Sequence, residues 1–176
     1  VDGVDIALRE GETLGIVGES GSGKSTLGLA VLRLISSTGR VVFLGRDVQG
    51  LSAKRLRPLR RDMQIVFQDP YGSLSPRMTV GDIVAEGLRV HQPGLSAVDL
   101  DQRVVRALRE VGVDPQTRFR YPHEFSGGQR QRIASARGLV LEPRLLVLDV
   151  PTSALDMSVQ AQVVDQIGRA PCRERE

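Results

Sequence analysis

The chain has 176 residues, of which 40% are hydrophobic and 3% aromatic, and its formal net charge is +3. This length and composition suit one domain with a single buried core. The mild charge and the absence of Trp argue against a nucleic-acid-binding surface, and no apolar run reaches the roughly 20 residues of a membrane span. We therefore expect contact with a membrane only through a partner.

The first predicted elements lead into a glycine-rich loop. Alternating Val4, Ile6 and Leu8 predict a half-buried strand, and residues 12–18 predict a second short strand. Residues 24–35 have the apolar spacing of a helix. The sequence begins without Met, inside an alternating pattern, so we expect one or more strands of this part to precede residue 1.

Further strands are predicted at 40–45, at 63–68 and at 144–150. The arginine-rich run at 53–62 is interpreted as a solvated helix face rather than a patch that binds polyanions. Residues 145–148 are all apolar, which is typical of a strand in a parallel sheet that is covered on both faces.

Three helices are predicted among these strands. One covers 79–90 behind the cap Thr79, the second follows the capping pair Ser96 and Asp99, and the third begins after Ser126. Alternating strands and helices predict an α/β fold with a mainly parallel sheet, an antiparallel N-terminal part and a helical insert between about 72 and 125.

The stretch "GESGSGKST" fits the phosphate-binding pattern G-x-x-x-x-G-K-[ST]. Its glycines let backbone N–H groups curve around a phosphate, and the helix that follows adds its positive dipole end. Lys24 neutralises the β- and γ-phosphates, and the Ser25 hydroxyl binds Mg²⁺. The predicted nucleotide-binding residues of this loop are Gly18, Glu19, Ser20, Gly21, Ser22, Gly23, Lys24, Ser25 and Thr26. The alternative is an ordinary glycine-rich turn.

A second ligand for the metal is expected at the end of a neighbouring buried strand. Asp149 follows "LLVL" and occupies such a position. Its alternative role is to end the strand at a turn before Pro151.

The stretch "FSGGQRQ" predicts another anion site, because two glycines follow Ser126 at the positive end of a helix. One nucleotide does not need two such sites in one chain. A symmetric dimer does, since the "SGGQ" of one chain can cap the nucleotide of the other. The alternative is a plain capped helix.

Taken together, these stretches resemble the ATP-binding subunit of ABC transporters. Walker A is "GESGSGKST", the Q-loop is "VFQDP", the signature is "FSGGQ" at 125–129 with Phe125 where Leu is usual, Walker B is "LLVLDV" and the D-loop is "SALD". The stretches "VFQDPYGSLSPRMTV" and "YPHEFSGGQRQRIA" look like the bacterial oligopeptide and dipeptide uptake branch, which includes importers of microcin C and related peptides. The resemblance covers residues 1–165.

The resemblance implies ATP and Mg²⁺ as cofactors and a role for each motif. Gln68 would sense the γ-phosphate and bind the metal together with Ser25 and Asp149, and these residues would act in catalysis with Lys24. Four signature residues would contact the ATP of the opposite subunit, with Asp156 in the dimer interface: Ser126, Gly127, Gly128 and Gln129.

The resemblance also implies partners and a location. A second ABC ATPase domain would complete a homo- or heterodimer, and transmembrane permease subunits would dock on the helical insert. The protein would lie at the cytoplasmic face of the bacterial inner membrane, held there by the permease, without nucleic acid.

Two stretches depart from the family pattern. Val150 stands where the family has a catalytic Glu, and general-base help is worth about 10²- to 10⁴-fold in rate, so we expect binding of Mg·ATP with slow turnover. Residues 166–176 lack an apolar helical stripe and are interpreted as a non-native tail. His91 and His123 have no metal-ligand partner at useful spacing and are expected to be surface or packing residues.

Three alternatives to an importer ATPase stay open at this point. A regulatory nucleotide-binding subunit would explain Val150. A non-transport ABC ATPase of DNA repair or translation would carry long insertions, which the sequence lacks. A P-loop kinase of small molecules would have no use for "SGGQ".

Overall fold

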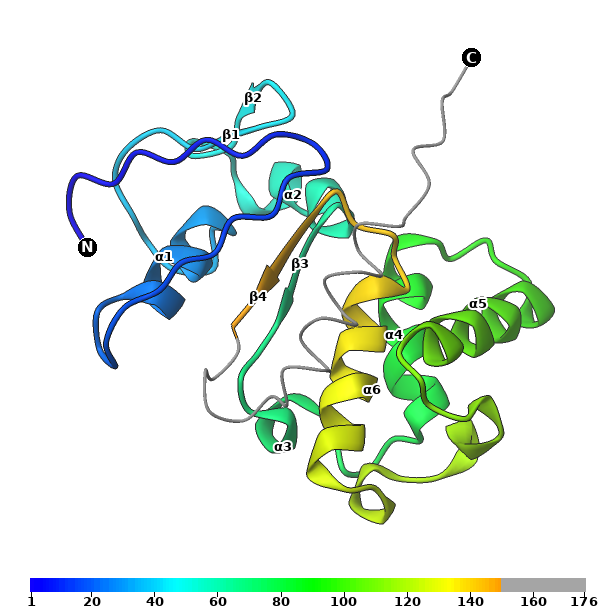
Figure 1. Ribbon diagram of the computed structural model, residues 1–176. Helices are drawn as coiled ribbons and strands as arrows, with labels where there is room; N and C mark the ends of the chain where they lie inside the picture. Colours follow the sequence, from blue (N-terminus) through cyan, green and yellow to red (C-terminus); the bar gives the residue numbers. More distant parts are fainter. Residues whose placement is uncertain (150–176) are drawn as a thin grey trace.

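The computed structural model describes residues 1–149, except for the side chains of Pro70 and Tyr71. A central pair of strands separates two regions of different character (Figure 1). These strands are β3 (Met63–Val66) and β4 (Leu145–Leu148). Before them come α1 (Lys24–Val31), β1 (Val42–Phe43), β2 (Arg46–Asp47), α2 (Ala53–Leu56) and the 3-10 turn η1 (Pro58–Arg61). Between them come α3 (Pro70–Ser73), α4 (Val80–His91), α5 (Ala97–Glu110), η2 (Pro115–Phe119), η3 (Pro122–Glu124) and α6 (Gly127–Leu139).

Strands β3 and β4 are parallel, in a register that pairs Met63 with Leu145 and Val66 with Leu148. Helix α1 packs on one face, where a Cβ on Gly28 would lie 3.0 Å from the Val147 side chain. Helix α6 packs on the other face, where a Cβ on Gly138 would lie 3.2 Å from the Val66 side chain. The prediction of a parallel sheet covered on both faces is confirmed, although all four residues of β4 are only half-buried.

The helices after β3 begin where the sequence predicts. Thr79, Ser96 and Ser126 each stand at an N-cap, and each accepts a hydrogen bond from the N–H three residues later. The apolar faces of α4, α5 and α6 form the larger core, whose fully buried members include Val80, Ile83, Val84, Leu88, Leu108 and Ile133. Local capping and a 3.6-residue period account for this region. The insert boundaries at 72 and 125 stay predictions.

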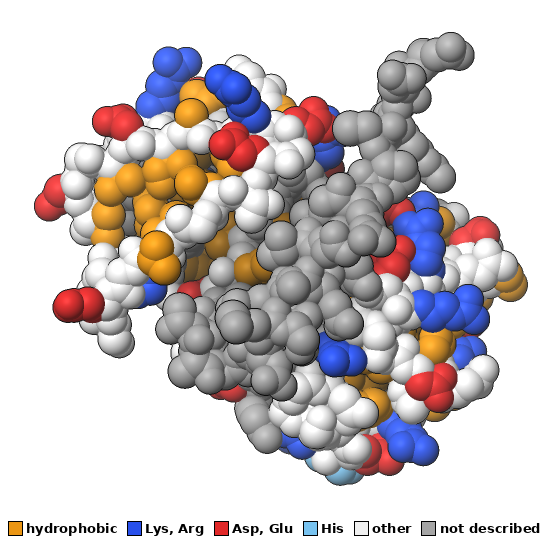
Figure 2. Space-filling view, in the orientation of Figure 1, with side chains coloured by type: hydrophobic (Ala, Val, Ile, Leu, Met, Phe, Trp, Pro, Cys, Tyr) orange, Lys and Arg blue, Asp and Glu red, His pale blue; other side chains and the backbone are white. Residues whose placement is uncertain are grey.

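The strands predicted at 4–8 and 12–18 are wrong: within residues 1–149 the first strand is β1. Strands need a paired neighbour to satisfy their backbone groups, and β1 pairs only with β2, antiparallel. The side chains of Val4, Ile6 and Leu8 are consequently 44–46% exposed. Figure 2 shows an orange apolar surface over the N-terminal part of the molecule.

The arginine-rich run at 53–62 forms α2 and η1, but it is not simply a solvated face. The Arg60 guanidinium donates to the carbonyl oxygens of Leu32 and Arg33, both at 3.0 Å. These carbonyls follow the last turn of α1, where a cation is favourable. One arginine of the run therefore holds the end of α1 against the segment that enters β3, which corrects the expectation for that residue.

Candidate functional site

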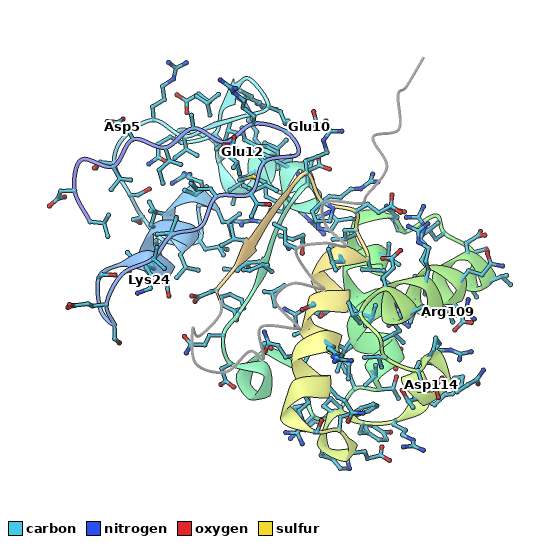
Figure 3. All side chains as sticks on the ribbon, in the orientation of Figure 1. Asp5, Glu10, Glu12, Lys24, Arg109 and Asp114 are labelled. Atoms are coloured by element: carbon cyan, nitrogen blue, oxygen red, sulfur yellow. The ribbon has the colours of Figure 1, made fainter. Side chains whose placement is uncertain are left out.

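The phosphate-binding loop at 18–26 is organised around Lys24, the first residue of α1 (Figure 3). Its ammonium donates to the carbonyl oxygens of Gly18 and Glu19, at 2.8 and 2.6 Å, and to the Ser22 hydroxyl at 3.2 Å. The positive charge thus sits inside the curve of its own loop. A phosphate oxygen that replaces one of these carbonyls would meet a charge already held in place.

Two glycines of this loop are required by its geometry. Gly23, the N-cap of α1, has φ +94°, a left-handed conformation that favours glycine. Gly21 has φ +81°, in the same left-handed region. No side chain caps α1, so the first N–H groups of this helix are available to an anion.

Ser25 and Asp149 meet, although 124 residues separate them in the sequence. The Ser25 hydroxyl donates to the Asp149 carboxylate at 2.8 Å, and the Asp149 N–H donates to the Val66 carbonyl at 2.9 Å. The second contact continues the β3–β4 ladder and fixes Asp149 at the carboxyl end of the sheet. Two of the three expected metal ligands, Ser25 and Asp149, therefore converge beside the loop that holds Lys24.

The donor set fits Mg²⁺. A hydroxyl and a carboxylate are hard oxygen ligands, and Mg²⁺ commonly takes one or two carboxylates together with substrate phosphates and water. Across residues 1–149, His, Cys, Asp and Glu side chains gather in no group of three or more that could hold a metal alone. A metal at Ser25 and Asp149 would accordingly need oxygens from a bound phosphate.

Gln68 lies two residues past the end of β3 and is exposed. Because β3 and β4 are parallel and Val66 pairs with Leu148, Gln68 and Asp149 leave the sheet at the same edge. Ligands of open α/β folds bind at the carboxyl edge of such a sheet. The structure thus places the expected γ-phosphate sensor at the right edge, with no direct contact between Gln68 and Lys24 among the described hydrogen bonds.

The stretch at 125–129 forms the start of α6. Ser126 and Gln129 make a reciprocal capping box: the Gln129 N–H donates to the Ser126 hydroxyl at 3.3 Å, and the Ser126 N–H donates to the side-chain Oε1 of Gln129 at 3.0 Å. Cβ atoms at Gly127 and Gly128 would meet open space. Ser126 and Gln129 therefore cap each other, and the two glycines leave an open approach to the helix start.

The loop at 18–24 and the start of α6 lie apart in this chain (Figure 1). Phe125 is buried in the larger core, so the apolar position of the stretch anchors it while its polar residues face outward. The two helix starts that were expected to bind anions therefore lie at separate places in one molecule.

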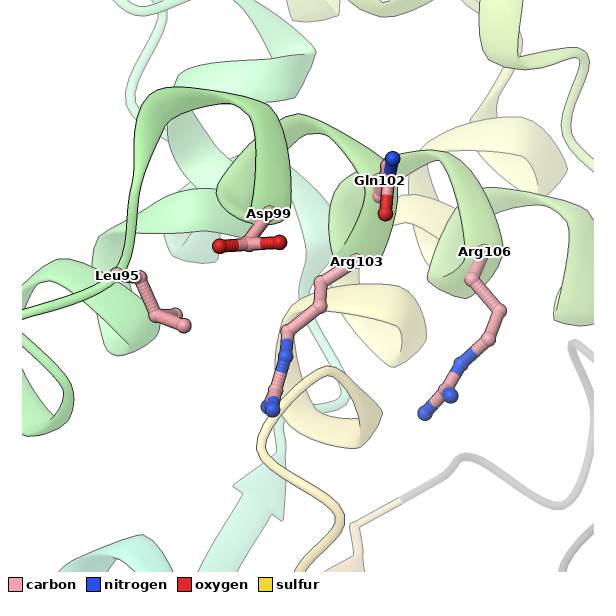
Figure 4. Close-up of a pocket in the computed structure, with 5 residues that line it drawn as sticks. All are labelled: Leu95, Asp99, Gln102, Arg103 and Arg106. Atoms are coloured by element: carbon pink, nitrogen blue, oxygen red, sulfur yellow. The ribbon is translucent and has the colours of Figure 1, made fainter.

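Of two hollows on the surface of the described residues, one adjoins the loop at 18–24. One, of about 320 Å³, lies beside Gly18 and Lys24 and has mostly apolar walls from the N-terminal segment, among them Val4, Ile6 and Ile16. The other, of about 270 Å³, lies along α5, where Leu95, Asp99, Gln102, Arg103 and Arg106 point to one side (Figure 4). Residues of the candidate site line only the first.

Several expected residues have other outcomes. Val150 and Asp156 lie outside the described residues, so the predictions of slow turnover and of a dimer contact at Asp156 stay predictions.

His123 is exposed and stacks on Tyr121 with ring centroids 5.8 Å apart. His91 is half-buried at the end of α4, where burial and the charges of Arg57 and Arg61 lower its pKa. Both histidines are surface or packing residues, as expected.

Residues 1–153 match the family described as ABC transporter. The chain belongs to the ABC transporter family. It is 67% identical over 165 residues to "Peptidoglycan transport ATP-binding protein YejF" of Agrobacterium fabrum, covering 94% of this chain and 30% of that protein. It is 55% identical over 166 residues to "Oligopeptide transport ATP-binding protein OppF" of Salmonella typhimurium, covering 94% of this chain and 50% of that protein. The chain thus spans about a third to a half of these relatives.

Solved structures of ABC cassettes share the fold. A dimeric ATP-binding cassette in a post-hydrolysis state, bound to ADP and Pi, has a TM-score of 0.82 and 30% identity, covering 92% of this chain and 70% of that one. The cassette cbiO1 from Clostridium perfringens, part of the ABC transporter complex cbiONQ, has a TM-score of 0.79 and 32% identity, covering 94% and 67%. The α/β assignment and the family resemblance are confirmed. Among the described helices, none has the length and apolar character of a membrane span.

Sequence reasoning missed two arginines of α6 that hold the loops of this site. Arg130 donates to the carbonyls of Pro122 and His123, at 2.8 and 3.3 Å, and Arg137 donates to the carbonyl of Ser73 at 2.6 Å. In the sequence they look like solvent-facing charges. Their spacing of seven residues, which puts them on one face of the helix, is the signal that could have separated them from the others.

Proposed function

We propose that this chain is the ATP-binding module of a peptide importer and that it binds Mg·ATP at Lys24, Ser25 and Asp149. The hydrogen bond between the Ser25 hydroxyl and the Asp149 carboxylate is the observation that carries the proposal. It brings the two metal-ligand types together at the mouth of a phosphate loop whose helix start is uncapped. Peptide import follows from the relatives, since those reported above are named for peptidoglycan and oligopeptide transport.

The second half of the proposal is a dimer, homo- or heteromeric, that acts with permease subunits at a membrane. The start of α6 is open at Gly127 and Gly128, but it lies apart from the loop at 18–24. A twofold dimer would let each α6 approach the nucleotide of the other chain. In that arrangement Lys24, Gln68 and the metal would assist transfer of the γ-phosphoryl group to water. The relatives are named as transport proteins, and nothing in the comparisons favours a regulatory subunit that does not hydrolyse ATP.

Equilibrium binding of ATP with and without Mg²⁺ tests the first half. We expect Asp149→Asn and Ser25→Ala to abolish most of the gain in affinity that Mg²⁺ gives, because each removes a metal ligand. We expect Lys24→Ala to weaken ATP binding about 10- to 100-fold, since it removes a charged phosphate contact. Ser52→Ala is the matched control, because Ser52 is exposed and its side chain makes no cap hydrogen bond to α2.

Equal affinity with and without Mg²⁺ in the parent protein would refute the metal site. Sedimentation with Mg·ATP tests the dimer: Ser126→Arg should keep ATP binding at Lys24 while preventing nucleotide-dependent dimerisation. A Ser126→Arg protein that dimerises like the parent would refute the role of α6.

A further inference from the structure

We infer that Arg137 is the positioning residue of Gln68: it ties the segment that follows β3 to α6, and so sets Gln68 for contact with the γ-phosphate. The inference rests on the proposed nucleotide site and adds a residue to it. Arg137 does not touch the site itself. It acts through the backbone of α3.

The segment that carries Gln68 begins at the surface and ends in the larger core. It runs between Val66 and Leu74, which are 2% and 3% exposed, and Phe67, Gln68 and Asp69 between them are all exposed. Helix α3 is four residues long, a single turn that is marginal by itself. Helix α3 packs on α6, and this packing supports the stretch.

Arg137 supplies a directed contact in that packing. Its guanidinium donates to the Ser73 carbonyl at 2.6 Å, across 64 residues of sequence, and the side chain is half-buried. Ser73 is the last residue of α3, and the last carbonyls of a helix have no N–H donor within the helix. A cation at the carboxyl end of a helix is also favoured by the helix dipole. A charged donor is thus placed at the point where α3 needs one.

The same helix holds a second loop of the site in the same way. Arg130, seven residues earlier on α6, donates to the carbonyls of Pro122 and His123, just before Ser126. Residues seven apart lie on one face of a helix. Helix α6 therefore connects the turn before Ser126 to the segment behind Gln68 through two arginine side chains, and Arg137 is the connection on the Gln68 side.

A specific consequence distinguishes this role from general support. ADP lacks the γ-phosphate that Gln68 would contact, while Lys24 and the loop at 18–24 reach both nucleotides. Loss of the Arg137 contact should weaken ATP binding and leave ADP binding nearly unchanged. A purely structural role would weaken both equally or lower only the stability of the fold.

The test measures ATP and ADP affinities, with Mg²⁺, of the full chain and of Arg137→Met and Arg137→Lys. We expect ATP affinity to fall about tenfold in Arg137→Met, because Gln68 would lose one hydrogen bond to the charged γ-phosphate, with ADP affinity within about twofold of the parent. Arg137→Lys keeps the charge but loses the planar guanidinium. Its affinity for ATP should therefore lie between that of the parent and that of Arg137→Met. The control is Arg132→Met, since Arg132 lies on the same helix and also donates to a carbonyl, that of Gly112 at 3.3 Å.

Hydrogen exchange without nucleotide gives a second readout. Amides of residues 67–74 should exchange faster in the Arg137 variants and not in Arg132→Met, while the rest of α6 keeps its protection. Uniformly faster exchange along α6, or an ATP-to-ADP affinity ratio equal to that of the parent, would overturn the inference and leave the proposed function standing. A parent chain that binds neither nucleotide would overturn the proposed function, and this inference with it.

Discussion

The region before Leu51 and the region from Leu74 to Leu141 differ in how completely their apolar side chains are buried. In the later region, apolar side chains such as Leu88 and Leu108 are fully buried between helices with defined caps. In the earlier region, apolar side chains such as Leu14 and Val17 remain exposed, and the small core contains Leu32, Phe43 and Val48. A helix satisfies its backbone within itself, whereas a strand depends on a neighbour. The region that offers the phosphate loop is thus the one whose order depends more on remote partners or on a ligand.

The largest expected effect is a direct test of this contrast. Leu108→Ala should lower the free energy of unfolding by about 2–5 kcal/mol, because it leaves a cavity among α4, α5 and α6. Leu14→Ala should cost less than about 1 kcal/mol, since that side chain is 47% exposed. Urea unfolding monitored by circular dichroism measures both. Equal costs would mean that the N-terminal segment is packed as well as the helical region.

A medium effect separates a structural cap from a cap in the candidate site. Ser96 and Ser126 accept the same type of hydrogen bond, at 3.1 and 3.3 Å, at the starts of α5 and α6. Ser96→Ala and Ser126→Ala should each lower stability by about 1 kcal/mol. Only Ser126→Ala should also weaken ATP-dependent dimerisation in sedimentation experiments. A similar loss of dimer in Ser96→Ala would assign the effect to helix stability alone.

The smallest expected effect concerns the junction of the two regions, where His91 of α4 lies near Arg57 and Arg61. Burial, followed by these two charges, lowers the pKa of His91 in the folded state. The unfolded chain therefore takes up this proton first as the pH falls below about 6.5. The corresponding stability is present above that pH and is lost as the pH falls through the folded-state pKa. His91→Gln should flatten the dependence of the urea midpoint on pH between 8 and 5. An unchanged slope would contradict the lowered pKa of His91 in the folded state.

The sequence was most informative where structure is decided locally. Thr79, Ser96 and Ser126 marked three helix starts because a side chain and an N–H three residues later suffice to cap a helix. The phosphate loop and Asp149 could be paired from the sequence, because such a loop needs a second metal ligand and Asp149 follows an apolar strand. Their meeting at 2.8 Å is the part of the site that the structure adds.

The remaining features depend on contacts that no local pattern encodes. The segments at 4–8 and 12–18 have the alternation of strands, but alternation cannot supply a neighbouring strand. The arginines at 60 and 137 differ from other arginines only by the carbonyls that they reach, and those carbonyls lie 27 or more residues away in the sequence. Charge alone therefore predicted a solvated surface at 53–62, where one side chain proved to be a helix cap.

Helix α6 packs closely on the sheet near its carboxyl end, and this contact affects the position of its N-terminus. Gly138 packs against Val66 too closely for a larger side chain to fit without a shift. Ser126, the N-cap of α6, lies twelve residues earlier. At 1.5 Å per residue, the distance along the helix from Gly138 to Ser126 is roughly 18 Å. A tilt of about 5° at Gly138 would sweep Ser126 through roughly 1.5 Å, half the length of a hydrogen bond. The close contact at Gly138 thus helps to set where the N-terminus of α6 lies.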